Sequence, residues 1–349
     1  MTDAICKEIL LKKNRVTDQV GSIYFGGGTP SLLPERALEK IFDTLTSHFS
    51  IAEDAEITIE TNPDDLSAQK IAALRRLPVN RFSIGVQSFF NEDLLWMNRA
   101  HNAAEAETCI KRSQDAGFEN LSLDLIYGYP LLTDEKWLSN IQQVSGLQIP
   151  HVSAYSMTVE PRTALAAAIK KGQQTPVNDE QSAAQFTLLS TKLAAAGFDH
   201  YEISNYSLPG RHAIHNTNYW RGIPYLGIGP SAHGFNSNLR YMNVSNNAQY
   251  ISSLKAGKLA ETVEELDVYD RFNEYLMTSL RTMWGTDLDY ITQVFGPYFR
   301  AETQKGLQPF LEKNWLKYDR SRLLLTAEGK LFADYIAAEL FLLNEESGN

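Results

Sequence analysis

Between residues 20 and 160 the chain repeats one pattern: a short β-rich run, a polar or glycine-rich turn, and then a helical stretch. The β-rich runs span residues 22–25, 56–60, 81–87, 121–126 and 151–157. The helical stretches between them span residues 35–49, 67–77, 103–116 and 134–146. Strand–helix units that recur about every 30 residues form a parallel sheet, because a parallel neighbour needs a helical crossover. The pattern therefore predicts an α/β fold, either a barrel or a doubly wound sheet.

Polar residues stand at or near the carboxyl ends of these runs. They are Gly26–Thr29, Glu60, Gln87, Asp124 and Ser156. In a barrel these strand ends share one rim, where binding and catalytic groups lie. One such residue alone is more simply a turn or cap residue, but five in series favour a shared site.

The rest of the chain follows other patterns. A helix at residues 3–13 precedes the first strand, and another is expected at 180–196. Residues 200–250 are rich in aromatic, Asn, His and Gly residues and are predicted to be loops. Then come amphipathic helices near 264–282 and 298–313, strands at 315–318 and 322–325, and a helix from Thr326. This last part resembles a winged-helix module, and we expect three regions: residues 1–205, 206–259 and 260–349.

Charge and composition exclude several classes of protein. The 349 residues carry a formal net charge of −10, which argues against nucleic acid or an anionic membrane as the main partner. Residues 264–349 contain 15 acidic and 9 basic side chains, so the winged-helix-like part is expected to pack or dock rather than bind DNA. No apolar run reaches the roughly 18 residues of a transmembrane helix. The two cysteines, Cys6 and Cys109, exclude a disulfide scaffold, and the predicted compartment is the cytoplasm.

The sharpest motif is the glycine triplet in residues 23–33, Ile-Tyr-Phe-Gly-Gly-Gly-Thr-Pro-Ser-Leu-Leu. Glycines directly after a strand allow backbone N–H groups to approach a ligand closely. The motif is neither a Walker loop nor a dinucleotide fingerprint, because its residues and spacing differ. With the runs 60–63, 83–89, 97–101 and 123–130, it resembles the radical-SAM family of oxygen-independent coproporphyrinogen III oxidases and heme chaperones. The resemblance covers nearly the whole chain.

The resemblance implies a fold and an S-adenosylmethionine pocket. The fold would be a partial TIM-type (β/α)6 barrel without its first strand, followed by the winged-helix-like α+β domain. The pocket would be lined by Gly27, Gly28, Thr29, Glu60, Gln87, Arg99 and Asp124. Glu60 and Asp124 could bind the cationic and ribose groups of the ligand, while Arg99 could bind its carboxylate. The simpler interpretation of Arg99 is a surface charge at the start of a helix.

One departure from the family affects the chemistry. The family has a Cys-x3-Cys-x2-Cys loop whose three thiolates hold a 4Fe-4S cluster, and this sequence has no such triplet. Cys6 and Cys109 both fall on the apolar side of predicted helices and are expected to be packing residues. A misassigned start, a shortened chain and a genuine loss of the cluster all stay open as causes. As written, the polypeptide is not expected to generate a radical.

A second motif, residues 212–220, follows the barrel. His215-Asn-x-x-Tyr-Trp220 is similar to the signature of the heme chaperone branch, which implies heme contacts from His215, Asn216, Tyr219 and Trp220. A neutral imidazole is a good axial ligand for heme iron, and the two aromatic rings offer flat apolar faces. His212 and His233 are rival ligands, and His233 could instead contact S-adenosylmethionine. The alternative is a histidine that caps a turn over core aromatics.

Three functions stay open at this stage. The first is a heme chaperone that binds heme and S-adenosylmethionine and delivers heme to a client protein, with client docking on the acidic C-terminal part. The second is an oxygen-independent coproporphyrinogen III oxidase, because one scaffold can host several activities. The third is an inactive barrel remnant, whose exposed edge would favour poor solubility or a homodimer.

Overall fold

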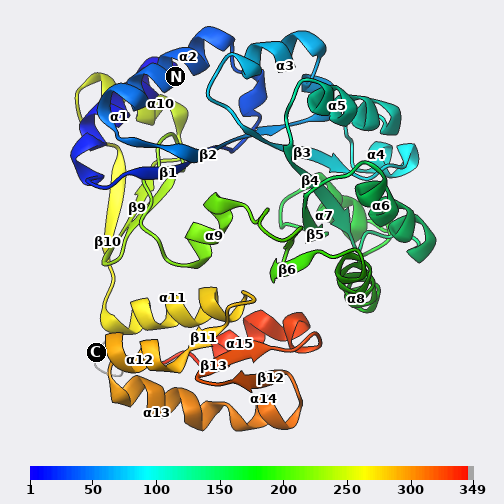
Figure 1. Cartoon of the computed structure of the whole chain (residues 1–349), viewed down its shortest axis with the longest axis vertical. Coiled ribbons are helices and arrows are strands. Elements are labelled where there is room, and N and C mark those ends of the chain that lie inside the picture. Colours follow the sequence, from blue (N-terminus) through cyan, green and yellow to red (C-terminus); the bar gives the residue numbers. More distant parts are fainter. Residues whose placement is uncertain (345–349) are drawn as a thin grey trace. The chain divides into compact units, whose positions relative to one another are not determined.

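The structure is a computed structural model, and it describes residues 1–344 (Figure 1). The chain forms two compact units. The central unit comprises Ser22–Glu35 and Glu56–Ala213. The terminal unit comprises Met1–Gly21, Arg36–Ala55 and the chain from Ile214 onward.

A seven-stranded sheet in the order β1-β2-β3-β4-β5-β7-β6 is formed by strands between Val20 and Ser207. Its strands are β1 (Val20–Phe25), β2 (Ile51–Thr61), β3 (Arg81–Gln87), β4 (Asn120–Tyr127), β5 (His151–Ser156), β6 (Asp199–Glu202) and β7 (Asn205–Ser207). Strands β2 to β5 pair in parallel, whereas β7 pairs antiparallel with both β5 and β6. The expected α/β fold of partial-barrel type is therefore confirmed, with an antiparallel hairpin at its last edge.

The helices between these strands are α2 (Glu35–His48), α3 (Ala68–Arg75), α4 (Asn91–Trp96), α5 (Ala103–Asp115), α6 (Asp134–Gly146), α7 (Ala164–Lys170) and α8 (Asp179–Ala195). Five of these helices lie close to the predicted ranges, and two short ones, α4 and α7, were not predicted. Local signals fix their ends. Asn102 and Glu105 form a capping box at the start of α5, and Gly117, with φ +85°, follows its end.

The parallel strands alternate two kinds of buried side chain. The apolar set, which includes Ile57, Ile59, Phe82, Ile84, Val86, Leu121, Leu123, Leu125, Val152 and Ala154, is almost fully buried. The alternate positions hold a polar set, which includes Glu56, Thr58, Arg81, Ser83, Ser122, His151 and Ser153. Successive residues of a strand face opposite sides of a sheet, so one face is apolar and the other is polar. A polar interior face suits a ligand site rather than a dry core.

In the terminal unit, α1 (Thr2–Lys12) and α10 (Asn247–Lys255) accompany a three-stranded antiparallel sheet in the order β10-β9-β8. Its strands are β8 (His233–Asn236), β9 (Leu239–Asn243) and β10 (Glu261–Glu265). Ala4 of α1 packs with Tyr250 and Leu254 of α10 in a small apolar cluster. The short helix α9 (Ile214–Trp220) belongs to the same unit.

The C-terminal part is an α+β arrangement, as predicted. It contains α11 (Val268–Leu280), β11 (Thr286–Asp287), α12 (Leu288–Val294), α13 (Pro297–Gly306), α14 (Gln308–Glu312), β12 (Leu316–Asp319), β13 (Arg322–Leu325) and α15 (Ala333–Glu339). Its sheet has the order β11-β13-β12, and both pairings are antiparallel. The single helix predicted at 298–313 is wrong, because the chain divides into α13 and α14 around Leu307. Pro309 lacks the N–H that an uninterrupted helix would need there.

The prediction of loops at 200–250 is also wrong. This segment contains β6, β7, α9, β8, β9 and α10. Its strands are only three to five residues long. In so short a run, the alternation of apolar and polar residues that marks a strand cannot be recognised. Within residues 1–344, no helix combines the length and the apolar character needed to cross a bilayer.

Candidate functional sites in the two units

The glycine loop at the end of β1 is fastened by Glu60 of β2. One oxygen of the Glu60 carboxylate accepts a hydrogen bond from the Tyr24 hydroxyl at 2.9 Å, and the other accepts one from the Gly27 N–H at 3.1 Å. A Cβ at Gly26 would lie 2.7 Å from the Tyr24 ring and 2.9 Å from Glu60, so only glycine fits. Gly27 and Gly28 adopt φ of +81° and +71°, which favours glycine at both positions. The loop therefore leaves its backbone exposed beside a carboxylate.

A second cluster forms around Gly85, near the end of β3. A Cβ at Gly85 would lie 3.0 Å from the Gln87 side-chain nitrogen, 3.3 Å from Arg99 and 3.4 Å from Asn62. Arg99 donates to the Asn62 side-chain oxygen at 2.5 Å and to the Gly85 carbonyl at 3.1 Å. The Arg99 Nε is buried and has no hydrogen-bond partner among residues 1–344. Gln87 itself has φ +68°, a conformation that side-chain-bearing residues adopt rarely. Arg99 is thus held by the protein and still has donor capacity for an anion.

Asp124 lies in β4, between Ser83 of β3 and Ser153 of β5. The Ser83 hydroxyl donates to one Asp124 oxygen at 3.1 Å, and Asp124 and Ser153 face each other in the strand register. Burial raises the pKa of Asp124 to about 6, although the Ser83 hydrogen bond and the charge of Arg81 oppose the rise. Within residues 1–344, Asp124 forms no ion pair with a basic side chain. This carboxylate is held on the polar face of the sheet with hydroxyl partners alone.

All seven residues predicted for the S-adenosylmethionine pocket therefore belong to the central unit. Gly27 donates a hydrogen bond to Glu60, and the side chains of Gln87 and Arg99 both lie beside Gly85. Gly28 and Thr29 continue the same loop as Gly27. Sequence patterns missed Tyr24 and Asn62, which hold Glu60 and Arg99, respectively. The signal for Tyr24 was available, because it stands two residues before the glycine triplet in β1.

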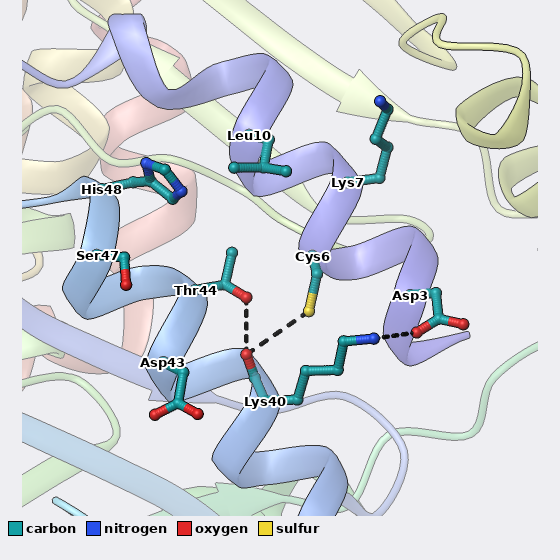
Figure 2. Close-up of a pocket in the computed structure, with 9 residues that line it drawn as sticks. All are labelled: Asp3, Cys6, Lys7, Leu10, Lys40, Asp43, Thr44, Ser47 and His48. Atoms are coloured by element: carbon teal, nitrogen blue, oxygen red, sulfur yellow. Dashed lines mark hydrogen bonds and ion pairs between the residues drawn. The ribbon is translucent and has the colours of Figure 1, made fainter.

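The two cysteines do not form a cluster site. Both are buried, Cys6 on α1 of the terminal unit and Cys109 on α5 of the central unit. Figure 2 shows Cys6 directed at the Lys40 carbonyl, with the sulfur and oxygen 3.8 Å apart, in a groove between α1 and α2. Burial raises the pKa of the Cys109 thiol to about 12. The residues of this chain therefore do not fit a 4Fe-4S cluster, and across residues 1–344 no three His, Cys, Asp or Glu side chains gather at a metal site. The expectation that both cysteines are packing residues agrees with their burial.

The second motif forms α9 in the terminal unit. His215 and Tyr219 are neighbours along one face of the helix, and Asn216 and Trp220 along the next, because each pair is four residues apart. Tyr219 is 48% exposed, whereas the other three side chains are half-buried. Gly222, with φ +65°, ends the helix as its amide donates to the Tyr219 carbonyl at 3.1 Å. The motif thus presents an imidazole and two rings from a single short helix.

Aromatic and cationic neighbours support α9. The Tyr219 ring lies 5.4 Å from that of Tyr225, whose backbone bonds in both directions with Phe235 of β8. Burial and the neighbouring Tyr219 raise the pKa of Tyr225 to about 12. Two arginines also lie over indole rings: Arg221 over that of Trp284, and Arg281 over that of Trp220. Sequence patterns missed both, although Arg221 directly follows Trp220.

A buried ion cluster joins α1 to the small sheet of the same unit. Lys12 pairs with Glu8 at 2.6 Å and with Glu261 of β10 at 3.0 Å, and Arg15 also pairs with Glu261. Lys12 donates to the Gly227 carbonyl at 3.1 Å, and Glu8 accepts from the Gly229 N–H at 2.8 Å. The cluster therefore holds the turn that follows Tyr225.

The rival histidines have different environments. His212 belongs to the central unit, where its Nε2 lies 3.1 Å from Asp199 and its ring packs 4.7 Å from that of Tyr201. His233 begins β8 and is exposed. Its strand partner is Met242 of β9. Neither histidine lies on α9.

Comparison with known proteins first defines the class. Residues 6–144 match the sequence profile of the radical SAM superfamily, and residues 266–332 match that of the HemN C-terminal domain. The fold is similar to that of coproporphyrinogen III oxidase (HemN) from Escherichia coli, described as a radical SAM enzyme. That likeness has a TM-score of 0.82 and 24% identity, and covers 97% of this chain and 82% of the oxidase. At this identity the likeness shows the fold alone.

Curated heme chaperones are more similar in sequence. Heme chaperone HemW of Escherichia coli (strain K12) is 35% identical over 329 residues, which cover 93% of this chain and 84% of that protein. HemW of Bacillus subtilis (strain 168) is 32% identical over 317 residues, which cover 90% of this chain and 84% of that protein. The chain therefore belongs to the HemW family of heme chaperones, which confirms the resemblance inferred from its motifs.

Proposed function

We propose that this chain is a heme chaperone that binds heme on α9 and delivers it to a client protein. The observation that carries the proposal is the grouping of His215, Asn216, Tyr219 and Trp220 on one short, accessible helix. The His215 imidazole would serve as axial ligand to the iron. Because the Tyr219 and Trp220 rings stand at 88° to each other, one would contact the porphyrin with its face and the other with its edge. The sequence likeness to curated heme chaperones supports the same function.

S-adenosylmethionine is the proposed ligand of the central unit, and the residues present fit it. The free donor capacity of Arg99 suits the ligand's carboxylate. Glu60 and Asp124 supply acceptors for its ammonium and ribose hydroxyls, while Gly27, Gly28 and Thr29 allow a close backbone approach, with Gln87 beside Arg99. When bound, this ligand would supply a sulfonium centre. The chain's own residues bind and orient it, and we assign them no bond-breaking step.

The oxidase alternative has less support. Its basis is the likeness to HemN, which at 24% identity carries the fold but no activity. Oxidative decarboxylation through a radical would also require a cluster that the cysteines of this chain do not fit. We therefore keep heme delivery as the proposed function.

A heme-requiring protein is the proposed client, the acidic C-terminal part of residues 260–349 is the proposed docking region, and the cytoplasm is the proposed compartment. Residues 1–205 and 206–259 are the proposed barrel and connecting regions. A deletion after Leu259 should abolish transfer to an apoprotein acceptor, whereas heme binding should be weakened but not lost. A homodimer is also proposed, and sedimentation analysis would test it.

An anaerobic heme titration followed by absorbance tests the proposal. The unaltered chain should give a saturable Soret shift near one heme per chain, and His215→Ala should abolish or displace it. His48→Ala is the matched control, because His48 is an exposed histidine of the same unit at the end of α2. A spectrum that is the same in His215→Ala and the unaltered chain would exclude His215 as the ligand.

A further inference from the structure

Two arginines form a cationic edge beside α9. The guanidinium carbon of Arg221 lies 4.2 Å from the ring centroid of Trp284, and that of Arg281 lies 5.3 Å from the ring centroid of Trp220. Trp220 ends α9 and Arg221 directly follows it, whereas Arg281 and Trp284 follow α11. Two segments about 60 residues apart are thus joined by a reciprocal pair of cation–π contacts. The aromatic surface of α9 therefore carries positive charge at one border.

The two arginines differ in how much of their charge is committed. Arg221 is exposed and forms no ion pair with a carboxylate in the described part of the chain. Arg281 pairs through one terminal nitrogen with Asp334, which is 81% exposed, whereas its own side chain is 18% exposed. The Arg281 Nε is buried and has no hydrogen-bond partner within residues 1–344. The Arg221 guanidinium is thus uncommitted to any carboxylate of residues 1–344, and Arg281 keeps the terminal nitrogen that does not bond Asp334 for an incoming anion.

This edge is unusual for such an acidic chain. The sequence has a net charge of −10, so exposed arginines are more simply neutralised by nearby carboxylates. Stacking on an indole face holds the planar guanidinium in place and leaves its N–H edge directed along the ring border. A guanidinium fixed in this way binds a carboxylate with two parallel hydrogen bonds. The best-matched ligand is an aromatic plate that carries carboxylates on one edge.

We propose that Arg221 and Arg281 bind the two propionate groups of heme while the perpendicular rings of Tyr219 and Trp220 contact the porphyrin, one with its face and the other with its edge. This inference rests on the proposed function and deepens it, because it assigns the recognition of the dicarboxylate edge to residues outside the histidine motif. The iron would be recognised by His215 and the propionates by the arginine pair. The arginine pair alone should then distinguish heme from a porphyrin without free carboxylates.

The test compares heme with heme dimethyl ester, in which both propionates are neutral, for the unaltered chain, Arg221→Gln and Arg281→Gln. Each substitution should weaken heme binding about 10-fold, and the double variant about 100-fold, because each removes one charge-assisted contact. Binding of the dimethyl ester should be unchanged in all variants, which also shows that the site is folded. Arg221→Lys should recover only part of the loss, because an ammonium cannot make the bidentate contact.

Lys313→Gln is the matched control. Lys313 also lies over an indole, 4.5 Å from the Trp315 ring centroid, in the same unit but away from α9, so its loss should leave both affinities unchanged. Equal weakening of heme and ester in the arginine variants would overturn the inference and assign the arginines to packing. So would unchanged heme binding in the double variant. Absence of a saturable Soret shift in the unaltered chain would instead overturn the proposed function itself.

Discussion

Two pairs of carboxylates, one pair in each unit, differ in the partners that hold them. In the terminal unit, Glu8 and Glu261 are neutralised by Lys12 and Arg15 at short distances. In the central unit, the partners of Asp124 and Glu60 include hydroxyl and backbone N–H groups. Glu8 and Glu261 are already paired within the protein, whereas Asp124 and Glu60 form no ion pair with a basic side chain of residues 1–344 and keep negative charge for a cationic ligand. Other carboxylates of the central unit are paired, such as the buried Asp93 with Lys136 at 3.1 Å.

The pKa values follow the same division. Burial opposes ionisation of Glu261, but hydrogen bonds from Arg15 and Lys12 outweigh it and lower the pKa of that carboxyl. For Asp124 burial dominates and raises the pKa to about 6. A buried carboxylate that lacks a cation is a candidate binding group, whereas one that is fully paired is more simply structural.

The largest effect is expected from Lys12→Met. The substitution leaves Glu8 buried with its charge, while Glu261 keeps Arg15 as a partner. Removing one partner of a buried ion pair costs about 3–5 kcal/mol, because the remaining charge is desolvated without compensation. Urea denaturation followed by circular dichroism at pH 7.5 measures the loss. A change below about 1 kcal/mol would mean that the cluster is effectively solvated.

Asp124→Asn should act in the opposite direction. The folded-state pKa of about 6 lies above the unfolded value of about 3.9, so the native state binds this proton more tightly. The resulting stabilisation is present below about pH 4 and is lost as the pH rises through about 6. Asparagine cannot ionise, so the variant should gain up to about 3 kcal/mol over the unaltered chain at pH 7.5.

Denaturation midpoints at pH 4 and pH 7.5 test this prediction, with Asp54→Asn as an exposed control. The advantage of Asp124→Asn should disappear at the lower pH. An advantage that is equal at both pH values would contradict the assigned titration, because it could not come from a proton bound at Asp124.

Arg99→Ala addresses ligand binding rather than stability. Loss of a charge-assisted hydrogen bond to the ligand carboxylate should weaken S-adenosylmethionine binding about 10- to 100-fold. Isothermal titration calorimetry measures the affinity, and Arg76→Ala, which removes an exposed partner of Glu35, is the control. Equal affinities in Arg99→Ala and the unaltered chain would assign Arg99 to holding Asn62 alone.

Lys40→Met should have the smallest effect. Lys40 pairs with Asp3 on the surface, as Figure 2 shows. The Asp3 pKa is lowered by its hydrogen bond to Lys40, and both side chains are exposed. Exposed ion pairs are screened and lose side-chain entropy, so the denaturation midpoint should not move measurably. A shift comparable to that of Lys12→Met would erase the distinction between the buried cluster and the surface pair.

Much of the fold could be predicted because its signals are local. The spacing of strands and helices up to residue 157 needs only period and capping residues, and Gly117 and Asn102 are visible in the sequence. The hairpin of β6 and β7 could not be predicted, because its strands are short and are stabilised by pairing with β5, which is distant in sequence. The helix break at Leu307 is different, because Pro309, which accounts for it, is visible in the sequence.

The candidate sites were predictable to the extent that motifs are contiguous. The glycine triplet and the run from His215 to Trp220 are readable as sequence. Asn62 at Arg99 and Trp284 at Arg221 are not, because these contacts join separate segments. The ion cluster of Lys12 was missed for the same reason, since Glu261 lies far along the chain and Glu8 alone resembles a surface residue of a helix.

The most direct measurement titrates two variants, His215→Ala and Arg99→Ala, with both heme and S-adenosylmethionine. Because the two candidate sites use different residues in different units, His215→Ala should lose heme and keep S-adenosylmethionine. Arg99→Ala should show the reverse. That crossed pattern is the predicted result. If either variant lost both ligands while remaining folded, or if both variants kept heme unchanged, the assignment of two separate sites would be contradicted.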